Sequence, residues 1–258
     1  MDASLMLLDV KKFEKIELGS IGSTNDYAKE LAKGGVADYA FVRAVEQIRG
    51  RTTKKDSPWF SPPGNLYFTA LVRLSSEEAR YFSRLSFITA LSVVETVLEI
   101  ANEDANIVPC VKIKWPNDVL INVKKACGIL IEKEGPHAII GVGLNVAISP
   151  ASGSVSVVYP TTSLAGEGIK SNVAAVAQIL GSRLVDNING CKLHGFASII
   201  EKVLPFMYKI GERVCIEFAG RQIEGLFEGL DNSGGIIIAG KNEKTTLLSG
   251  EMTKENFI

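Results

Sequence analysis

The sequence predicts a mixed α+β fold in which helices and strands alternate, followed by a small all-β unit. Apolar stripes at helical spacing, preceded by capping residues, predict helices at 23–34, 76–101, 172–187 and 195–209. Runs rich in β-branched and aromatic residues predict strands at 40–45, 66–72, 111–115, 119–123, 128–132 and 138–147. From Gly211 onward, only short strand-like runs occur between turns, at 213–218, 222–230, 235–239 and 245–248. We therefore expect one domain over residues 1–209 and a second, typical of a barrel, over residues 210–258.

The composition is that of an ordinary globular protein. The chain has 258 residues, of which 46% are hydrophobic and 22% are charged. This length accommodates one large domain and one small domain. The 28 Lys and Arg residues nearly balance the 29 Asp and Glu residues, so the net charge is −1 and no overall basic field favours nucleic acid.

The cysteine and histidine pattern does not predict a metal site. The cysteines are scattered, with no C-x-x-C pair, and we expect them to be reduced and mostly buried: Cys110, Cys127, Cys191 and Cys215. The histidines, His137 and His194, share no metal-ligand spacing with them.

The start of the chain does not predict a targeting segment. Residues 1–8 carry an early acid, and their apolar stretch is too short for a signal peptide or a membrane span. We therefore expect a cytoplasmic protein that does not associate with a membrane.

The segment Lys112–Val119, with the sequence KIKWPNDV, is the strongest candidate for a ligand site. Lys114 lies at the end of a predicted strand, and Pro116 stops that strand because it lacks an N–H group. Asn117 and Asp118 then bend the chain through side-chain hydrogen bonds to the backbone. Strand ends are common ligand sites, and a lysine there suits a carboxylate or a phosphate. The alternative is a surface turn with a solvated lysine, and this segment alone does not decide between the two.

A basic loop and a tryptophan follow the predicted strand at 40–45. The loop Glu46–Lys55 carries four cations around Gly50, namely Arg49, Arg51, Lys54 and Lys55. It has little apolar content, so we expect it to be mobile without a ligand and to close over an anion through Arg51 and backbone N–H groups. Taken alone, a solvated basic loop is the commoner interpretation. Trp59 follows closely, where its ring can pack on a flat ligand or anchor the core.

Two glycines interrupt the apolar strand predicted at 138–147. Gly141 and Gly143 permit another group to approach the backbone closely, and Asn145 can donate hydrogen bonds to a ligand. The pattern is not a dinucleotide-binding fingerprint, because no helix with a third glycine follows.

Taken together, in their order and spacing, several segments resemble the biotin protein ligases, and the resemblance covers nearly the whole chain. The matching segments are Ser23–Asn25, Gln47–Arg51, Trp59–Pro62, Lys114–Asp118, Gly128–Glu132, Gly141–Asn145 and Thr162–Leu164. The resemblance implies a class II synthetase-like α+β fold, with a mixed, largely antiparallel central sheet flanked by helices and a small C-terminal SH3-like β-barrel. The sequence has no room for a helix-turn-helix before the first strand, so we expect the short form without the N-terminal DNA-binding domain.

The resemblance also implies a two-step reaction with biotin and ATP as substrates and Mg²⁺ to neutralise the ATP. The biotin carboxylate attacks the α-phosphorus of ATP, which gives biotinyl-5′-AMP and pyrophosphate. A lysine amine of a biotin carboxyl carrier domain, of the acetyl-CoA carboxylase type, then attacks this mixed anhydride and forms an amide with release of AMP. Positive charge is needed where carboxylate and phosphate meet, because they repel each other in a pocket of low dielectric constant. The oligomeric state is left open, although relatives form homodimers through an exposed edge of the main sheet.

The matched positions carry the family's functional residues over to this chain. Lys114 and Arg51 are the implied catalytic residues, with Lys114 against the biotin carboxylate and the α-phosphate, and Arg51 as a clamp on phosphate or carboxylate. The implied biotin-binding residues are Ser23, Thr24, Asn25, Gln47, Gly50, Arg51, Thr52, Thr53, Lys114, Gly128 and Ile129. The implied ATP-binding residues are Arg51, Trp59, Lys114, Asn117, Asp118 and Asn145. Residues 23–25 can also serve as a plain helix N-cap, and Asp118 can equally anchor the turn.

The chain departs from the family in its basic loop. The family's loop usually runs Gly-Arg-Gly followed by another Arg or a polar residue, whereas here Thr52 replaces the second Gly and Thr53 follows it. One residue is also inserted before Trp59, near residues 56–58. Because threonine is disfavoured at positive φ, we expect loop closure to use a different backbone path.

Three other functions stay open at this point. A lipoate- or octanoyl-transferring relative would need a longer apolar slot and an Arg-rich, triple-Gly loop, which the sequence lacks. A non-catalytic sensor of biotin or its adenylate is disfavoured by the presence of both Lys114 and Arg51. A nucleic-acid-binding role would depend on the Arg49–Lys55 cluster alone, and the neutral overall charge disfavours it.

Overall fold

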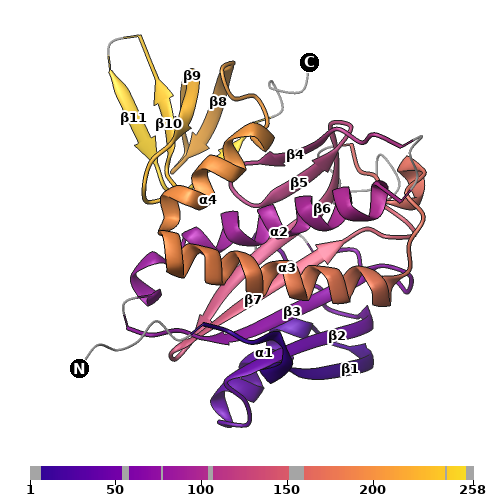
Figure 1. The fold of residues 1–258 in the computed structure, drawn as a ribbon. Helices are drawn as coiled ribbons and strands as arrows, with labels where there is room; N and C mark the ends of the chain where they lie inside the picture. The colour runs from indigo at the N-terminus through magenta and orange to yellow at the C-terminus, as the bar shows by residue number, and fades with distance from the viewer. Residues whose placement is uncertain are drawn as a thin grey trace.

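The computed structural model describes residues 7–53, 58–76, 78–103, 107–150, 160–241 and 243–253. In this part of the chain, a seven-stranded sheet packs against helices, and a five-stranded sheet follows toward the C-terminus (Figure 1). The predicted mixed α+β organisation followed by an all-β unit is therefore confirmed.

The central sheet has the strand order β1-β2-β3-β7-β6-β5-β4. Its strands are β1 (Glu14–Ile21), β2 (Tyr39–Gln47), β3 (Leu66–Arg73), β4 (Val111–Lys114), β5 (Asp118–Ile121), β6 (Lys124–Glu134) and β7 (His137–Leu144). Within the described residues, β1 and β2 pair in parallel, and the other neighbouring pairs are antiparallel. The sheet is therefore mixed and largely antiparallel.

The helices lie on both faces of this sheet. They are α1 (Thr24–Lys33), α2 (Arg84–Ala101), α3 (Val173–His194) and α4 (Phe196–Val203), with short 3₁₀ helices at Val10–Lys12, Glu78–Tyr81, Ala165–Glu167 and Leu204–Phe206. The apolar residues of α2 and α3 form the main core with Phe41 and Phe68 of the sheet. Ala28 of α1 packs with Val42 and Leu71 on the opposite face of the sheet. Val42 follows Phe41 along β2, and successive side chains of a strand point to opposite faces. No helix within the described ranges is both long enough and apolar enough to cross a membrane.

The alternation of side chains along β7 separates the main core from the opposite face. Ile140, Val142 and Leu144 belong to the main core, so Gly141 and Gly143 face the side that carries α1. Without a Cβ, these glycines admit other groups against the sheet, and a Cβ at Gly143 would lie 2.5 Å from the indole nitrogen of Trp59. The predicted close approach at the two glycines is confirmed, and it is made by side chains of the chain itself.

The second sheet has the strand order β11-β10-β9-β8-β12 and is antiparallel throughout. Its strands are β8 (Arg213–Phe218), β9 (Arg221–Leu230), β10 (Ile236–Ala239), β11 (Lys244–Leu247) and β12 (Glu251–Met252). Figure 1 shows this sheet beside α4 and on the far side of the molecule from β1. Arg84 at the start of α2 donates a hydrogen bond of 3.0 Å to the carbonyl of Asn232, which ties the sheet to the helical layer.

Strand β1 was missed by the sequence analysis because its alternation of apolar and charged residues is limited to Ile16 and Leu18 and ends at Gly19. It lies at an edge of the central sheet, and none of its side chains is fully buried. An edge strand with an exposed surface does not need the alternating apolar residues that reveal a half-buried strand.

The helix predicted at 76–101 consists of two elements. Ser75 and Glu78 form a reciprocal cap, because the Ser75 N–H donates to Glu78 Oε2 at 2.7 Å and the Glu78 N–H donates to Ser75 Oγ at 3.2 Å. This cap begins the short 3₁₀ helix Glu78–Tyr81, and α2 begins only at Arg84. The capping residues were therefore predicted correctly, but they begin the 3₁₀ helix and not α2.

The ends of the last two helices also differ from the prediction. Helix α3 continues to His194, beyond the predicted end at 187, because the Asn187 amide is buried and donates to Ser92 Oγ at 3.1 Å instead of ending the helix. Helix α4 ends at Val203, and a 3₁₀ turn containing a proline follows it. The four cysteines are free, as expected, although Cys110 is exposed.

Candidate functional site

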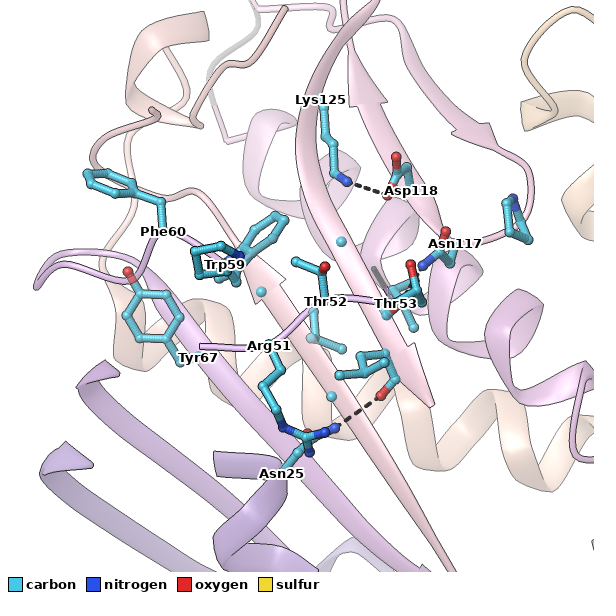
Figure 2. Close-up of a pocket in the computed structure, with 18 of the residues that line it drawn as sticks. Asn25, Arg51, Thr52, Thr53, Trp59, Phe60, Tyr67, Asn117, Asp118 and Lys125 are labelled. Atoms are coloured by element: carbon cyan, nitrogen blue, oxygen red, sulfur yellow. Dashed lines mark hydrogen bonds and ion pairs between the residues drawn. The ribbon is translucent and has the colours of Figure 1, made fainter. Parts of the chain in front are cut away.

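A cavity of about 490 Å³ opens on the face of the central sheet that carries α1 (Figure 2). This is the size of a small-molecule site. The cavity brings together predicted site residues from distant segments, namely Ser23, Thr24, Asn25, Gln47, Arg51, Thr52, Thr53, Trp59, Lys114, Asn117, Asp118, Gly128, Ile129 and Asn145. Gly50 does not line it but packs tightly in the base of the basic loop, where a Cβ would lie 2.5 Å from Ser61 Oγ.

One end of the cavity is a buried polar network at the start of α1. The backbone N–H and the hydroxyl of Thr24 donate to Gln47 Oε1 at 2.9 and 3.1 Å. Gln47 Nε2 in turn donates to Ser61 Oγ at 3.1 Å, and Thr69 Oγ1 donates to Asn25 Oδ1 at 2.7 Å. These groups hold one another in place and make this end of the cavity rigid.

The side chains at the start of α1 are not used as a simple helix cap. Ser23 occupies the N-cap position, yet its side chain makes no capping hydrogen bond. Thr24 and Asn25 bond to groups on other strands, and all three side chains are buried. The hydroxyl of Ser23 therefore lines the cavity without a capping role.

The carboxylate of Glu132, on β6, pairs with two cations near this end of the cavity. Arg51 Nη1 and Nη2 donate to Glu132 Oε1 and Oε2 at 2.8 and 2.5 Å, and Lys29 Nζ donates to Oε1 at 2.5 Å. Asn25 Nδ2 adds a hydrogen bond of 2.9 Å to Oε2, and Arg51 Nη2 also pairs with Asp26 Oδ1 at 2.8 Å. Figure 2 shows Arg51 directed from the loop toward Asn25. Two cations thus face two carboxylates, and their formal charges cancel.

The Glu132 carboxylate stays ionised well below its ordinary range. Burial alone raises the pKa of Glu132, but hydrogen bonds from Arg51, Lys29 and Asn25 outweigh burial and lower the pKa from 4.5 to about 2. Because the folded state holds the lower pKa, the ionised carboxylate stabilises the fold above pH 4.5, and this stabilisation is lost as the pH falls toward 2.

We predict that Glu132→Gln lowers the free energy of unfolding by up to about 3 kcal/mol at neutral pH. The difference in unfolding free energy between wild type and variant should shrink as the pH falls through the range from 4.5 to about 2. In that range Glu132 becomes protonated and, like the glutamine of the variant, carries no charge. Urea unfolding at a series of pH values measures this difference. A deficit that stays constant across the acidic range would contradict the assigned pKa.

The other end of the cavity holds Lys114 and the turn that follows it. Lys114 is the last residue of β4, pairs with Asp118 across the β4–β5 hairpin and is only 3% exposed. The Trp115–Pro116 peptide within the turn is cis, and Trp115 is buried. The predicted position of Lys114 at a strand end is confirmed, and its burial excludes the alternative of a solvated surface lysine.

The turn is fastened to strand β6 by its polar side chains. Asn117 Nδ2 donates to the Ile129 carbonyl at 2.8 Å, and the Ile129 N–H donates back to the Asn117 carbonyl at 2.9 Å. The Asp118 carboxylate pairs with Lys125 Nζ at 2.6 Å, and Figure 2 shows this pair at the end of the cavity opposite Asn25. Asn117 and Asp118 therefore anchor the turn while they line the cavity.

Trp59 lies against the floor of the cavity. A Cβ at Gly128 would lie 2.8 Å from Trp59 Cζ3, and a Cβ at Gly143 would lie 2.5 Å from Trp59 Nε1, so the indole packs directly on two glycine backbones. Lys125 Nζ lies 5.4 Å from the ring centroid. Trp59 Nε1 is buried against the Gly143 backbone and has no hydrogen-bond partner among the described residues.

Asn145 joins β7 to the segment Thr162–Leu164. Its Nδ2 donates to the Thr162 carbonyl at 2.9 Å, and its carbonyl accepts from the Leu164 N–H at 3.0 Å. Asn145 therefore lines the cavity and also holds β7 to this segment.

The basic loop passes through Thr52 and Thr53 without strain. Neither residue is among the non-glycine residues with positive φ in the described chain. The loop therefore follows a backbone path that threonine adopts readily at these two positions. The expected change in the course of loop closure stays a prediction. Lys54 and Lys55 of the predicted mobile loop, and residues 56 and 57 of the predicted insertion near 56–58, lie outside the described residues.

The sequence analysis missed several groups at the site. Lys125 lines the cavity, but nothing in the local sequence distinguishes it from the adjacent Lys124. Thr69 supports Asn25 from within an apolar strand, and Glu132 ended a matching segment without an assigned role. Residues 248–251 reach the cavity from the C-terminal sheet, a contact between segments that no local pattern indicates.

This site has a neutral hydrogen-bonding end and a buried lysine at the other end. A cavity of this kind is typical of α+β proteins that bind a small molecule with a polar head and an anionic group. Residues 18–145 match the Biotin/lipoate A/B protein ligase family, and residues 209–254 match the Biotin protein ligase C terminal domain.

Individual relatives agree with these matches. The chain is 30% identical over 242 residues to the biotin--[acetyl-CoA-carboxylase] ligase of Paracoccus denitrificans, covering 91% of this chain and 98% of that protein. It is 27% identical to the bifunctional ligase/repressor BirA of Escherichia coli, over 84% of this chain and 67% of the relative. The chain belongs to the biotin protein ligase family, which confirms the resemblance seen in its sequence.

Solved structures show the same fold. The biotin protein ligase from Aquifex aeolicus in complex with biotin and ATP superposes with a TM-score of 0.78 at 28% identity, covering 93% of this chain and 97% of that one. The Leishmania major enzyme in complex with biotinyl-5-AMP gives a TM-score of 0.65 at 26% identity, over 91% and 98% of the two chains.

Proposed function

We propose that this protein is an ATP-dependent biotin protein ligase that forms biotinyl-5′-AMP and transfers biotin to a lysine of a biotin carboxyl carrier domain. The observation that carries the proposal is a buried lysine, Lys114, in the same cavity as a hydrogen-bonded polar network around Asn25. The named activity of the Paracoccus relative and the biotin and ATP in the Aquifex complex support it.

The first half-reaction joins two anions. The biotin carboxylate attacks the α-phosphorus, the bond to the β-phosphate oxygen breaks, and pyrophosphate leaves. In this proposal Lys114 neutralises both groups as they meet, and its burial supports the role because charge interactions are stronger where the dielectric constant is low. In the second half-reaction, the acceptor amine attacks the carbonyl of the mixed anhydride, AMP leaves, and the amine loses a proton.

The two ends of the cavity suit the two ends of the intermediate. The ureido ring of biotin has two N–H donors and a carbonyl acceptor, which complement Ser23, Thr24 and Asn25. Gly128 and Ile129 line the slot between the ends by backbone approach and apolar contact. The neutral balance of charge around Glu132 favours an uncharged ring at that end and leaves the anionic groups for Lys114.

The nucleotide is assigned to the end near Lys125. Trp59 offers an aromatic ring in the cavity lining, and Lys125 adds a cation close to that ring. The described residues contain no group of three or more His, Cys, Asp and Glu side chains that could hold a metal ion. We therefore expect Mg²⁺ to be held mainly through the phosphates of ATP.

Incubation with biotin, ATP, Mg²⁺ and a biotin carboxyl carrier domain tests the proposal. We expect the acceptor to gain the mass of one biotinyl group at a single lysine, and we expect biotin-dependent ATP–pyrophosphate exchange without the acceptor. Exchange that responds to lipoate or octanoate instead of biotin would favour the lipoyl-type alternative. Binding of biotin without any exchange would favour the non-catalytic sensor.

We further propose that residues 210–258 form an SH3-like barrel that is separate from a catalytic domain at 1–209. The antiparallel order β11-β10-β9-β8-β12 and the match to the family's C-terminal domain support this division. Cytoplasmic location and pairing of two copies through an edge of the central sheet stay predictions.

A further inference from the structure

Lys125 lines the cavity because strand β6 carries a bulge. The pairing register shifts between Val119 and Leu120 of β5, which leaves Ala126 as an extra residue on β6. Ala126 and Cys127 are consecutive, yet both belong to the main core, whereas the side chains of a regular strand alternate between faces. The bulge therefore turns Lys125 away from the core and toward the cavity.

Hydrogen bonds on both sides fix the backbone of Lys125. Its N–H donates to the Pro160 carbonyl at 2.8 Å, and its carbonyl accepts from the Thr162 N–H at 2.9 Å. Glu167 accepts from Thr162 Oγ1 at 2.5 Å and from Asn122 Nδ2 at 2.6 Å, so the segment beside β6 is joined to the β5–β6 turn. The strand thus presents the Lys125 side chain to the cavity from a fixed position.

The Lys125 ammonium lies at the same end of the cavity as Lys114. It pairs with Asp118 Oδ1 at 2.6 Å, and Asp118 is the residue directly opposite Lys114 in the β4–β5 pair. Residues that are directly opposite in an antiparallel pair share a face of the sheet, so both lysines lie beside the same carboxylate. Figure 2 shows the Lys125–Asp118 pair well separated from Asn25, at the polar end.

The ammonium can bind a ligand while it pairs with Asp118. The Lys125 side chain is 25% exposed, and an ammonium carries three N–H donors, so one carboxylate does not use its full capacity. In the proposed reaction, the anionic groups of the substrates are the biotin carboxylate and the phosphates of ATP. Because Lys114 is assigned to the carboxylate and the α-phosphate, the β- and γ-phosphates are left for a second cation.

We propose that Lys125 binds the β- and γ-phosphates of ATP and stabilises pyrophosphate as it leaves. This inference rests on the proposed ligase function and adds a residue for the leaving group. As the biotin carboxylate oxygen bonds to the α-phosphorus, the bond from that phosphorus to the bridging oxygen breaks, and its electron pair stays on pyrophosphate. The Lys125 ammonium donates hydrogen bonds to the oxygens on which this charge collects. Asp118 keeps the ammonium at this position.

Two reactions of the same enzyme-bound adenylate test the inference. With labelled pyrophosphate, preformed biotinyl-5′-AMP returns to ATP and biotin. With a biotin carboxyl carrier domain, it transfers biotin in a step that involves no β- or γ-phosphate. In single turnovers at low pyrophosphate concentration, we expect Lys125→Met to slow ATP formation by about ten- to hundredfold, as for loss of a charged hydrogen bond. Transfer to the carrier domain should stay close to that of the wild type.

Lys124→Met is the matched control. Lys124 precedes Lys125 in β6, but it does not line the cavity, and its ammonium pairs with Glu167. We expect Lys124→Met to leave both reactions unchanged. Lys125→Arg keeps the positive charge, so it should retain most of the reaction with pyrophosphate. Thermal unfolding shows whether each variant is folded at the assay temperature, and Lys125→Gln replaces Lys125→Met if the latter is unfolded there.

The outcomes distinguish this inference from the proposed function. A wild-type protein that neither forms biotinyl-5′-AMP nor transfers biotin would overturn the proposed function. If the wild type carries out both reactions, a Lys125→Met protein that reacts with pyrophosphate as fast as the wild type would overturn the role of Lys125 alone. Equal slowing of both reactions would also overturn it, because the adenylate contains no β- or γ-phosphate.

Discussion

Replacing Lys114 with alanine is expected to reduce biotin-dependent ATP–pyrophosphate exchange by about 10²–10³-fold, the usual effect of removing one preorganised group that stabilises transition-state charge. Lys114 is buried at the end of β4 and lines the cavity. Solvent therefore cannot take over the neutralisation of the two anions when the lysine is removed. The loss should appear mainly in kcat, because the charge is needed most where carboxylate and phosphate meet. Steady-state exchange at saturating biotin and ATP measures it.

Lys112→Ala is the matched control for this substitution. Lys112 lies on the same strand two positions earlier, and its Nζ donates to the Pro205 carbonyl at 3.0 Å instead of lining the cavity. We expect Lys112→Ala to leave exchange close to that of the wild type. Lys114→Met keeps most of the buried volume, so it separates loss of charge from loss of packing. Near-normal exchange in folded Lys114→Ala and Lys114→Met would reject the assigned role.

The second large effect is expected from Gly143→Ala. A Cβ at this position would lie 2.5 Å from Trp59 Nε1 and 2.6 Å from Trp59 Cε2, so the indole has to move away from the floor of the cavity. Overpacking of this kind costs about 1–3 kcal/mol, which corresponds to an increase of roughly 5- to 150-fold in the KM for ATP if Trp59 holds the nucleotide. The chain contains 2 tryptophans, so a shift in indole fluorescence reports the displacement directly.

Gly19→Ala provides the control on the same sheet. Gly19 lies in β1, and nothing is within 4 Å of the position that its Cβ would occupy. This variant should change neither the fluorescence nor the KM for ATP. A Gly143→Ala protein that behaves like Gly19→Ala would show that the position of Trp59 does not affect nucleotide binding.

The features that were predicted correctly are those whose signals are local. Lys114 lies two residues before Pro116, and a proline ends a strand for reasons that depend only on its own ring and missing N–H group. Gly141 and Gly143 alternate with apolar residues of β7, so their exposure to the opposite face follows from the pleat. Such effects act over a few residues and can be read from the chain directly.

The features that were missed depend on contacts between distant segments. Arg51 was expected to clamp a phosphate or carboxylate group, but its acceptors Glu132 and Asp26 become neighbours only after β6 and α1 are packed together. Residues 248–251 line the cavity because the C-terminal sheet docks beside β4, and no periodicity in either segment encodes that docking. The role of Arg51 as a phosphate clamp stays a prediction.

Burial was the other quantity that the sequence left open. A Lys-Trp-Pro-Asn-Asp turn is compatible with a solvated lysine as well as with a ligand site, and the 3% exposure of Lys114 decides between them. That burial results from the packing of neighbouring strands and of Trp115, which lies 3.4 Å from the Cβ position of Gly250 in the C-terminal segment. The decisive property of the site is therefore created by the tertiary fold.

A crystal structure with biotin and a non-hydrolysable ATP analogue tests the central claim most directly. We predict that Lys114 Nζ donates hydrogen bonds to both the biotin carboxylate and the α-phosphate, while the ureido ring contacts Thr24 and Asn25. A bound complex in which Lys114 Nζ touches neither anion and points away from both ligands would contradict the account.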